Sequence, residues 1–344
     1  MRAITIEPGQ PAPDLAADDI VITEDVKLGG ERIRKGHRLQ AEDAALLARL
    51  DHPVHAVVLE DGDVHEDDAG ARLAAAVAGP GLEIRGPKFS RYNLVATTKG
   101  LLRVDAEALL RLNQLPGVAI FTLEDRLPMV PGKIVTGVKV TPVAVAEETV
   151  REAEQIAAAS PVVQVVPFRP LRVGVISTEG PEWRVRERFQ ESVKQKIGWY
   201  GGEVIGFSDQ PPEANAIAAE IERLADEGVD LVLAAGGSTI NPLDPTLRAL
   251  DVAGAEVVRV GAPAHPGSMF WLAYRGDLPI FNLASCSMFS KSTIADVVLP
   301  WIMTGERVEP DTLAGLGFGG LLDRGMPHRF PPYDVDTVEE KGEE

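Results

Sequence analysis

Residues 171–177, Leu-Arg-Val-Gly-Val-Ile-Ser, decide the fold because they form one largely apolar run. Such a run is typical of a strand that is buried on both faces of a parallel sheet. Further runs of this kind follow at 203–207, 230–235 and 256–260. Stretches with helical spacing lie between them at 185–199, 213–225 and 245–253. This alternation predicts right-handed crossovers and an α/β fold with a three-layer, mainly parallel sheet.

Two further elements are expected toward the end of this domain. The runs 269–274 and 278–283 flank the turn sequence Arg-Gly-Asp at 275–277, so they predict a hairpin inserted at one edge of the sheet. A long helix is predicted from Ser285 toward Met303. Pro300 is expected to kink or end this helix, because proline removes a helical hydrogen bond.

The 344 residues are enough for two or three domains. Residues 1–80 are predicted to form a small α+β unit, and 81–165 a β-rich α+β unit that ends in a linker helix. The α/β domain spans 171–310, and 311–344 form a C-terminal extension. The acidic tail of this extension, from Tyr333 onward, is predicted to be disordered because it holds few apolar residues.

Composition excludes several classes of protein. The formal net charge of −18 disfavours a nucleic-acid partner, since phosphate contacts need a basic face. One cysteine excludes a disulfide scaffold, and no apolar run is long enough to span a membrane. The first residues lack the apolar core of a secretory signal, so a cytoplasmic protein is expected. Most of the acidity lies in residues 1–30, 60–68 and 333–344, which carry −4, −6 and −5.

The chemistry is expected at the loop that follows the third strand. In open α/β sheets ligands bind outside the carboxyl ends of the strands. Gly236 and Gly237 let the backbone approach a ligand, and Ser238 and Thr239 offer hydroxyl donors. Asp244 has two interpretations that can coexist. It is the N-cap of the next helix, with Pro245 at N1, or a carboxylate that binds Mg²⁺ or a ligand amine.

Three other loops are rich in small and hydroxylated residues, at 177–180, 264–268 and 284–287. The first two follow strands, and the third begins the last helix. Together with 236–245 they predict a pocket for an anionic, phosphate-bearing small molecule. The glycines fit neither the G-x-G-x-x-G of dinucleotide binders nor a P-loop.

The spacing Gly236-Gly237-x-Thr239-(x)4-Asp244, followed by Pro266-Gly267 and by the run 278–283, resembles a known family. This is the molybdopterin-binding domain of molybdopterin molybdenumtransferases and molybdopterin adenylyltransferases, and the resemblance covers about residues 171–310. Segments 36–43, 55–58 and 65–69 resemble stand-alone molybdopterin-binding proteins of similar length, which are relatives of the transferases.

The resemblance implies a role in molybdenum cofactor biosynthesis, with binding of molybdopterin or adenylated molybdopterin, Mg²⁺ and, in an active enzyme, molybdate. Asp244 is implied as the catalytic carboxylate and metal ligand. Family members form dimers or trimers, so a homo-oligomer is expected, with a molybdoenzyme as a further partner. The implied cofactor contacts are Thr178, Glu182, Gly236, Gly237, Ser238, Thr239, Pro266, Gly267, Ser268, Ser285 and Cys286.

The chain departs from the transferases at several motifs. Their Lys-Pro-Gly-Lys loop is replaced by His-Pro-Gly-Ser at 265–268, so two cations are missing, and their Pro-Gly-Asn-Pro turn is replaced by 284–287. Their Asn-Ser-Ala-Met-Asp-Gly-Tyr-Ala segment and terminal β domain have no counterpart. These departures favour cofactor binding over molybdate insertion. The alternatives are a non-catalytic carrier or regulatory module, and a nucleotide-processing enzyme built on the same domain.

Three single residues have both a structural and a functional interpretation. Cys286 is either an inert small hydrophobe or a thiol activated by a helix N-terminus. His265 is either a surface loop residue or a titratable replacement for the missing lysine. Arg186, in the first turn of its helix, is either solvated or close enough to reach a phosphate.

Overall fold

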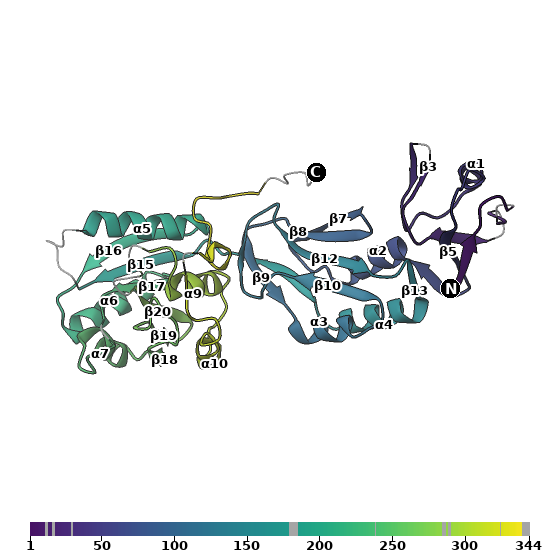
Figure 1. Ribbon diagram of the computed structural model, residues 1–344. Coiled ribbons are helices and arrows are strands. Elements are labelled where there is room, and N and C mark those ends of the chain that lie inside the picture. Colours follow the sequence, from purple (N-terminus) through teal and green to yellow (C-terminus); the bar gives the residue numbers. More distant parts are fainter. Residues whose placement is uncertain are drawn as a thin grey trace. The chain divides into compact units, whose positions relative to one another are not determined.

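The computed structural model describes residues 1–10, 13–15, 18–28, 30–178, 185–237, 239–283, 287, 290–323 and 325–338 (Figure 1). The chain forms two compact units. Unit 1 comprises Met1–Ala96, Val104–Leu123 and Ile134–Gln164, and unit 2 comprises Thr97–Arg103, Glu124–Lys133 and Val165–Glu344. Within the described residues, no helix combines the length and the apolar character needed to cross a membrane.

Unit 1 begins with a three-stranded antiparallel sheet in the order β1-β5-β2. Its strands are β1 (Arg2–Ile6), β2 (Asp19–Ile22) and β5 (Val54–Leu59). A hairpin of β3 (Val26–Leu28) and β4 (Glu31–Ile33) follows β2. A 3-10 turn, η1 (Ala41–Asp43), then leads into the single helical turn α1 (Ala44–Leu47). Apolar side chains from all of these strands and from α1 form one small core.

The rest of unit 1 is a four-stranded antiparallel sheet in the order β10-β12-β8-β7, with α2 packed against β8 and β12. The strands are β7 (Leu82–Lys88), β8 (Arg91–Ala96), β10 (Val118–Thr122) and β12 (Ile134–Val140). The helices are α2 (Glu66–Val77), α3 (Ala106–Asn113) and α4 (Glu147–Ala157), and β6 (Asp63–His65) pairs with β13 (Ala144–Ala146). Asp105 caps α3 by accepting a 3.0 Å hydrogen bond from Ala108 N.

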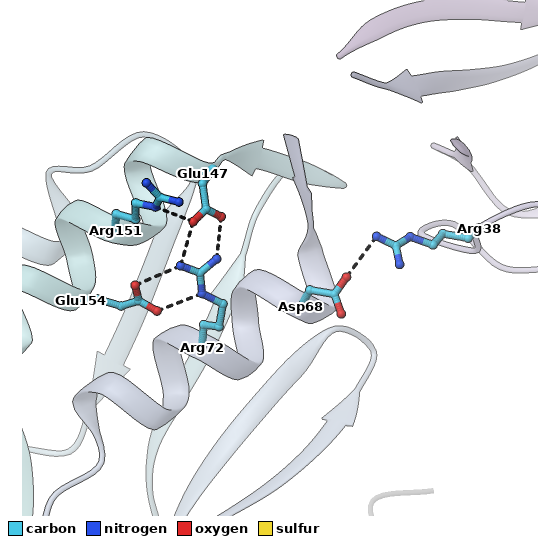
Figure 2. A network of polar contacts seen from close by, with 6 residues as sticks. All are labelled: Arg38, Asp68, Arg72, Glu147, Arg151 and Glu154. Atoms are coloured by element: carbon cyan, nitrogen blue, oxygen red, sulfur yellow. Dashed lines mark hydrogen bonds and ion pairs between the residues drawn. The ribbon is translucent and has the colours of Figure 1, made fainter. Parts of the chain in front are cut away.

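An ion-pair network joins α2 to α4 (Figure 2). Arg72 donates to Glu147 at 2.6 Å and to Glu154 at 2.9 Å, and Arg151 donates to Glu147 at 2.7 Å. Hydrogen bonds from Arg72, with a smaller contribution from Arg151, lower the pKa of Glu147 to about 2. Figure 2 also shows Arg38 reaching Asp68, at the first turn of α2, over 3.0 Å. Charged side chains therefore reinforce the apolar packing of α2.

Unit 2 contains a six-stranded sheet in the order β16-β15-β17-β20-β19-β18. Strand β19 runs in the direction opposite to the other five strands. The strands are β15 (Arg172–Ser177), β16 (Glu203–Asp209), β17 (Leu231–Ala235), β18 (Glu256–Val260), β19 (Trp271–Arg275) and β20 (Leu278–Leu283). The helices include α5 (Arg186–Trp199), α6 (Ala214–Asp226), α7 (Pro245–Val252), α9 (Ile294–Met303) and α10 (Pro310–Gly315). A short sheet in the order β11-β9-β14 is built from β9 (Gly100–Val104), β11 (Pro128–Met129) and β14 (Val163–Pro167).

Alternate side chains of the central strands enter two separate cores. In β17, Leu231 and Leu233 belong to the core that contains α5 and α9. Val232 and Ala234 belong to the core that contains α6 and α7. Figure 1 shows α5 on one side of the sheet and α6 and α7 on the other. The predicted α/β fold with a three-layer, mainly parallel sheet is confirmed, and its physical basis is a strand that is apolar on both faces.

Two predictions about the end of this domain are wrong. The hairpin of β19 and β20 is not at an edge, because β20 pairs with β17 in the interior and β18 forms the edge. Residues 278–283 are almost entirely apolar and buried, which suits an interior strand. The last helix begins at Ile294 rather than Ser285 and continues through Pro300 to Met303. Every residue of α9 is buried, so packing offsets the backbone hydrogen bond that Pro300 cannot make.

The C-terminal extension contributes to the core of unit 2. Leu322, Phe330 and Tyr333 are buried in the same core as α5 and α9. The Tyr333 hydroxyl donates a 2.9 Å hydrogen bond to Asp296 Oδ1. The segment predicted to be disordered is therefore ordered where it begins, and its residues 339–344 lie outside the described residues.

Candidate functional site

The glycine pair after β17 lies at the carboxyl edge of the unit 2 sheet. Gly236 and Gly237 have φ angles of +124° and +83°, in the left-handed region that favours glycine. A Cβ atom on Gly236 would lie 2.5 Å from Thr178 Oγ1, which is closer than Cβ atoms in proteins approach another heavy atom. The chain therefore needs glycine here to bring the turn after β17 against the residue that follows β15.

Thr178 is the first predicted contact residue that this turn meets. Its backbone N donates to Ala235 O over 3.3 Å, which ties the ends of β15 and β17 together. The side chain is half-buried beside Gly236. Two predicted site residues, separated by more than fifty positions in sequence, are thus in contact.

Asp244 caps α7. Its Oδ1 accepts a 2.9 Å hydrogen bond from Thr246 N, and Pro245 occupies N1, so the N-cap interpretation is confirmed. Thr246 Cβ would lie 3.3 Å from a Cβ on Gly237. The N-terminus of α7 and the glycine pair are therefore adjacent, and the positive end of the helix dipole faces this turn.

Asn282 is a structural residue of this edge to which the sequence had assigned no role. It is fully buried in β20, where its Nδ2 donates to Met269 O at 3.1 Å and to Gly237 O at 3.4 Å. Its Oδ1 accepts a 2.8 Å hydrogen bond from Trp271 N. One amide thereby holds the glycine turn and the start of β19 at fixed positions. The signal in the sequence is a single polar residue within an otherwise apolar strand.

Trp271 offers an unused donor beneath the same turn. The side chain is fully buried, and its Nε1 has no hydrogen-bond partner within the described part of the chain. A Cβ on Gly237 would lie 3.0 Å from this nitrogen. A buried donor without an acceptor is costly, by about 1–3 kcal/mol. A ligand or water that accepts from Nε1 would remove that cost.

The segment 265–268 is held against the start of α9. Pro266 O accepts a 3.2 Å hydrogen bond from Ile294 N, and a Cβ on Gly267 (φ +113°) would lie 2.5 Å from Ile294 Cγ2. The backbone of His265 pairs with Gly320 and Leu322, each at 2.8 Å. Ser268 is exposed. The segment is a fixed wall of the edge that carries no lysine or arginine.

A buried ion pair lies near the segment that follows β20, and nothing in the sequence pattern predicted it. Lys196 in α5 and Asp296 in α9 are 2.7 Å apart, with side chains 4% and 1% exposed. Lys196 Nζ also donates to Ser290 O at 2.7 Å and to Ser287 O at 3.2 Å. Asp296 Oδ2 accepts from Thr293 N and Oγ1 at 3.0 and 2.9 Å. The pair therefore fixes both ends of the segment from Ser287 to Thr293.

The remaining predicted site residues take no part in the contacts described above. Thr239 is half-buried in the turn before α7. Arg186 forms an ion pair with Asp209, at the end of β16, which places its charge at the same edge of the sheet. Within the described residues, no group of three histidine, cysteine, aspartate or glutamate side chains could hold a metal ion. Glu182, Ser238, Ser285 and Cys286 lie outside the described residues.

A cavity of about 450 Å³ lies at the opposite edge of the sheet in unit 2. Residues near the amino ends of β15, β17 and β20 line it, among them Leu171, Asp230 and Leu278. None of the predicted site residues contributes to that lining. Among the described residues, the carboxyl edge is marked by its glycine turn, its helix terminus and the indole donor of Trp271.

Comparison with known proteins gives matches among solved structures alone. No family model and no curated protein matches the sequence. The molybdopterin biosynthesis enzyme MoaB from Thermus thermophilus is 21% identical, with 40% of this chain and 98% of that chain covered and a TM-score of 0.29. The molybdopterin biosynthesis MoeA protein from Pyrococcus horikoshii is 16% identical, with 61% and 67% covered and a TM-score of 0.32.

The molybdopterin biosynthesis Mog protein from Mycobacterium ulcerans is 15% identical, with 42% of this chain and 100% of that chain covered and a TM-score of 0.31. All three proteins are named as molybdopterin biosynthesis proteins. TM-scores this low carry no information about individual residues or ligands.

Proposed function

We propose that the protein binds molybdopterin, or its adenylated form, at the carboxyl edge of the unit 2 sheet and acts in molybdenum cofactor biosynthesis. The observation that carries this proposal is the contact between three features: Thr178, the Gly236–Gly237 turn and the N-terminus of α7. They lie where the spacing of the sequence resembles the molybdopterin-binding domain. Ligands of open α/β sheets bind at this edge.

The residues of this edge fit a ligand that carries phosphate. Gly236 and Gly237 adopt left-handed backbones and carry no side chains, so a phosphate can approach the backbone of this turn. The positive end of the α7 dipole stabilises negative charge beside Gly237. Trp271 Nε1, beside Gly237, is a buried donor without an acceptor among the described residues. Local donors of this kind do not depend on the net charge of the domain, because salt screens distant charges beyond about 8 Å.

Asp244 is proposed to hold Mg²⁺ together with the phosphate oxygens of the ligand. Mg²⁺ in phosphate sites is commonly bound through one or two carboxylates and the phosphates themselves. Asp244 is half-buried, and its capping hydrogen bond keeps the carboxylate at the N-terminus of α7. Bound Mg²⁺ would neutralise phosphate charge at that position. Thr239, Pro266, Gly267 and Ser268 are proposed as further contacts on the rim, as are Glu182, Ser238, Ser285 and Cys286.

Binding without molybdate insertion is favoured by one observation. Ser268 is exposed in a segment that carries no lysine or arginine, where the transferases have two lysines. A transferring enzyme needs fixed cations to stabilise an oxyanion while it reacts. We therefore favour a carrier or regulatory binding module over a molybdenumtransferase.

Isothermal titration of the full chain with molybdopterin, adenylated molybdopterin and AMP tests the binding, with Mg²⁺ present. Asp244→Asn is the informative variant, because asparagine caps a helix about as well as aspartate but carries no charge. We expect its stability to stay within about 0.5 kcal/mol of wild type and its affinity to fall at least about tenfold. Gly198→Ala is the control, since a Cβ there meets nothing within 4 Å.

The remaining outcomes separate the alternatives. No binding of either pterin by the wild-type chain would contradict the proposal. Equal binding of AMP and the pterins would favour a nucleotide-processing enzyme. Molybdate- and Mg²⁺-dependent release of AMP from adenylated molybdopterin, lost in Asp244→Asn, would show that the protein is a transferase after all. A dimer or trimer and a molybdoenzyme partner stay predictions, which light scattering and co-purification test.

A further inference from the structure

A second cavity, of about 390 Å³, lies within unit 1. It is formed by the chain after β4, the first turn of α2, the turn between β7 and β8, and Lys139 of β12. Its volume falls in the range of about 300–1,000 Å³ that is usual for small-molecule sites. All of its lining belongs to unit 1, so the cavity is separate from the site proposed in unit 2.

Three cations of this cavity form no salt bridge with another described residue. Arg34, Lys35 and Lys139 line it, and none of them forms an ion pair within the described part of the chain. The fourth cation, Arg32, is paired with Asp25 at 2.5 Å. The whole chain has a net charge of −18, but these side chains make this part of the cavity wall positive. The positive wall favours a ligand that carries negative charge.

Phe89 presents an aromatic ring beside these cations. The side chain is 68% exposed, and Phe89 and Ser90 both have left-handed backbones, with φ of +53° and +58°. Asparagine and glycine are the usual residues of such a two-residue turn, so phenylalanine here is strained. Lys139 Nζ donates to Phe89 O over 3.2 Å, and the Arg34 guanidinium lies 5.2 Å from the ring centroid. The strained turn holds an exposed ring next to positive charge.

Buried acceptors without partners lie behind the same wall. Glu66 is 1% exposed, and its Oε1 has no hydrogen-bond partner within the described residues. This oxygen lies so close to Gly36, which lines the cavity, that a Cβ there would overlap it. Asp67 also lines the cavity and has a buried Oδ1 that lacks a partner among the residues described. Asp67, which lines the cavity, would accept N–H donors from a ligand.

We propose that this cavity binds a heteroaromatic monophosphate whose ring carries an N–H donor edge. The ring stacks on Phe89, the N–H edge donates to Asp67, and Arg34, Lys35 and Lys139 hold the phosphate. Guanosine monophosphate combines these three groups, because guanine has adjacent N–H donors that match a carboxylate. The proposal does not depend on what the unit 2 site binds.

Titration calorimetry of the full chain with guanosine monophosphate, guanosine and inorganic phosphate tests each group in turn. We expect the monophosphate to bind at least about tenfold more tightly than guanosine or phosphate alone. Phe89→Gly relieves the strained backbone, so it keeps the fold while removing the ring. We expect it to weaken the monophosphate about tenfold or more, since stacking on an aromatic side chain contributes to base binding.

Lys35→Ala should weaken the monophosphate about tenfold and leave guanosine unchanged. Lys133→Ala, an exposed lysine outside the cavity lining, is the charge-matched control and should leave both unchanged. Asp244→Asn should also leave binding unchanged, which separates this cavity from the unit 2 site. The proposal is overturned if the monophosphate does not bind, if phosphate binds as tightly as the monophosphate, or if Phe89→Gly and Lys35→Ala both bind like wild type.

Discussion

The buried pair of Lys196 and Asp296 makes the sharpest prediction about stability. The Lys196→Met substitution keeps most of the side-chain volume but removes the charge, so Asp296 stays buried without its cation. Removing one partner of a buried pair typically costs about 3–5 kcal/mol. The near-complete burial of both side chains places this pair in that class rather than among exposed pairs, which are worth about 0–1 kcal/mol.

Urea unfolding followed by tryptophan fluorescence measures this cost in unit 2 alone, because all four tryptophans lie between residues 165 and 344. With a urea dependence of about 2–3 kcal/mol/M, the midpoint of Lys196→Met should fall by about 1–2 M. The segment from Ser287 to Thr293 should also gain proteolytic sensitivity, because Lys196 Nζ holds the carbonyls of Ser287 and Ser290.

The double variant Lys196→Met/Asp296→Asn distinguishes an unpaired charge from lost packing. An asparagine side chain at position 296 can still accept from Thr293 and donate to the Tyr333 hydroxyl, but it carries no buried charge. The double variant should therefore be more stable than Lys196→Met by at least about 1 kcal/mol. A Lys196→Met cost below about 1 kcal/mol, or a double variant no more stable than the single one, would refute the reasoning.

Two further predictions concern glycine packing and acid stability. Gly267→Ala should destabilise unit 2 by about 2–4 kcal/mol, because its Cβ would press on Ile294. Gly276→Ala, where a Cβ would meet open space, should cost only about 1 kcal/mol. Urea unfolding compares the two variants, and equal costs would contradict the packing argument. The lowered pKa of Glu147, to about 2, stabilises unit 1 fully above the ordinary pKa of 4.5 and is lost as pH falls from about 4.5 toward 2. Hydrogen exchange of α2 amides across that pH range should show this loss, and Arg72→Met should remove most of the pH dependence; an unchanged slope in the variant would count against it.

Much of the fold was readable from local pattern. The apolar runs at 171–177 and 230–235 became β15 and β17, and Asp244 caps the helix that it was expected to cap. These features follow from interactions between residues close in sequence, which is what hydrophobic periodicity and capping signals report. The glycine turn of the candidate site belongs to the same class, because its shape depends on a local backbone conformation.

The misplaced elements fail for a different reason. The run 278–283 predicts a buried strand equally well at either position in the sheet, and only pairing with β17 puts it in the interior. Helix α9 continues through Pro300 because all of its residues are buried. Neither outcome has a local signal, since both depend on which distant segments supply the surrounding surface.

The sequence by itself determined that the second half of this protein is a mainly parallel α/β sheet and that a glycine turn follows its third strand. Tertiary structure alone decided which polar side chains hold that edge together. Asn282 bonds a carbonyl 45 residues away, and Lys196 pairs with an aspartate 100 residues away. Buried polar groups must be satisfied wherever the chain folds against itself, and partners so distant in sequence leave no periodic trace.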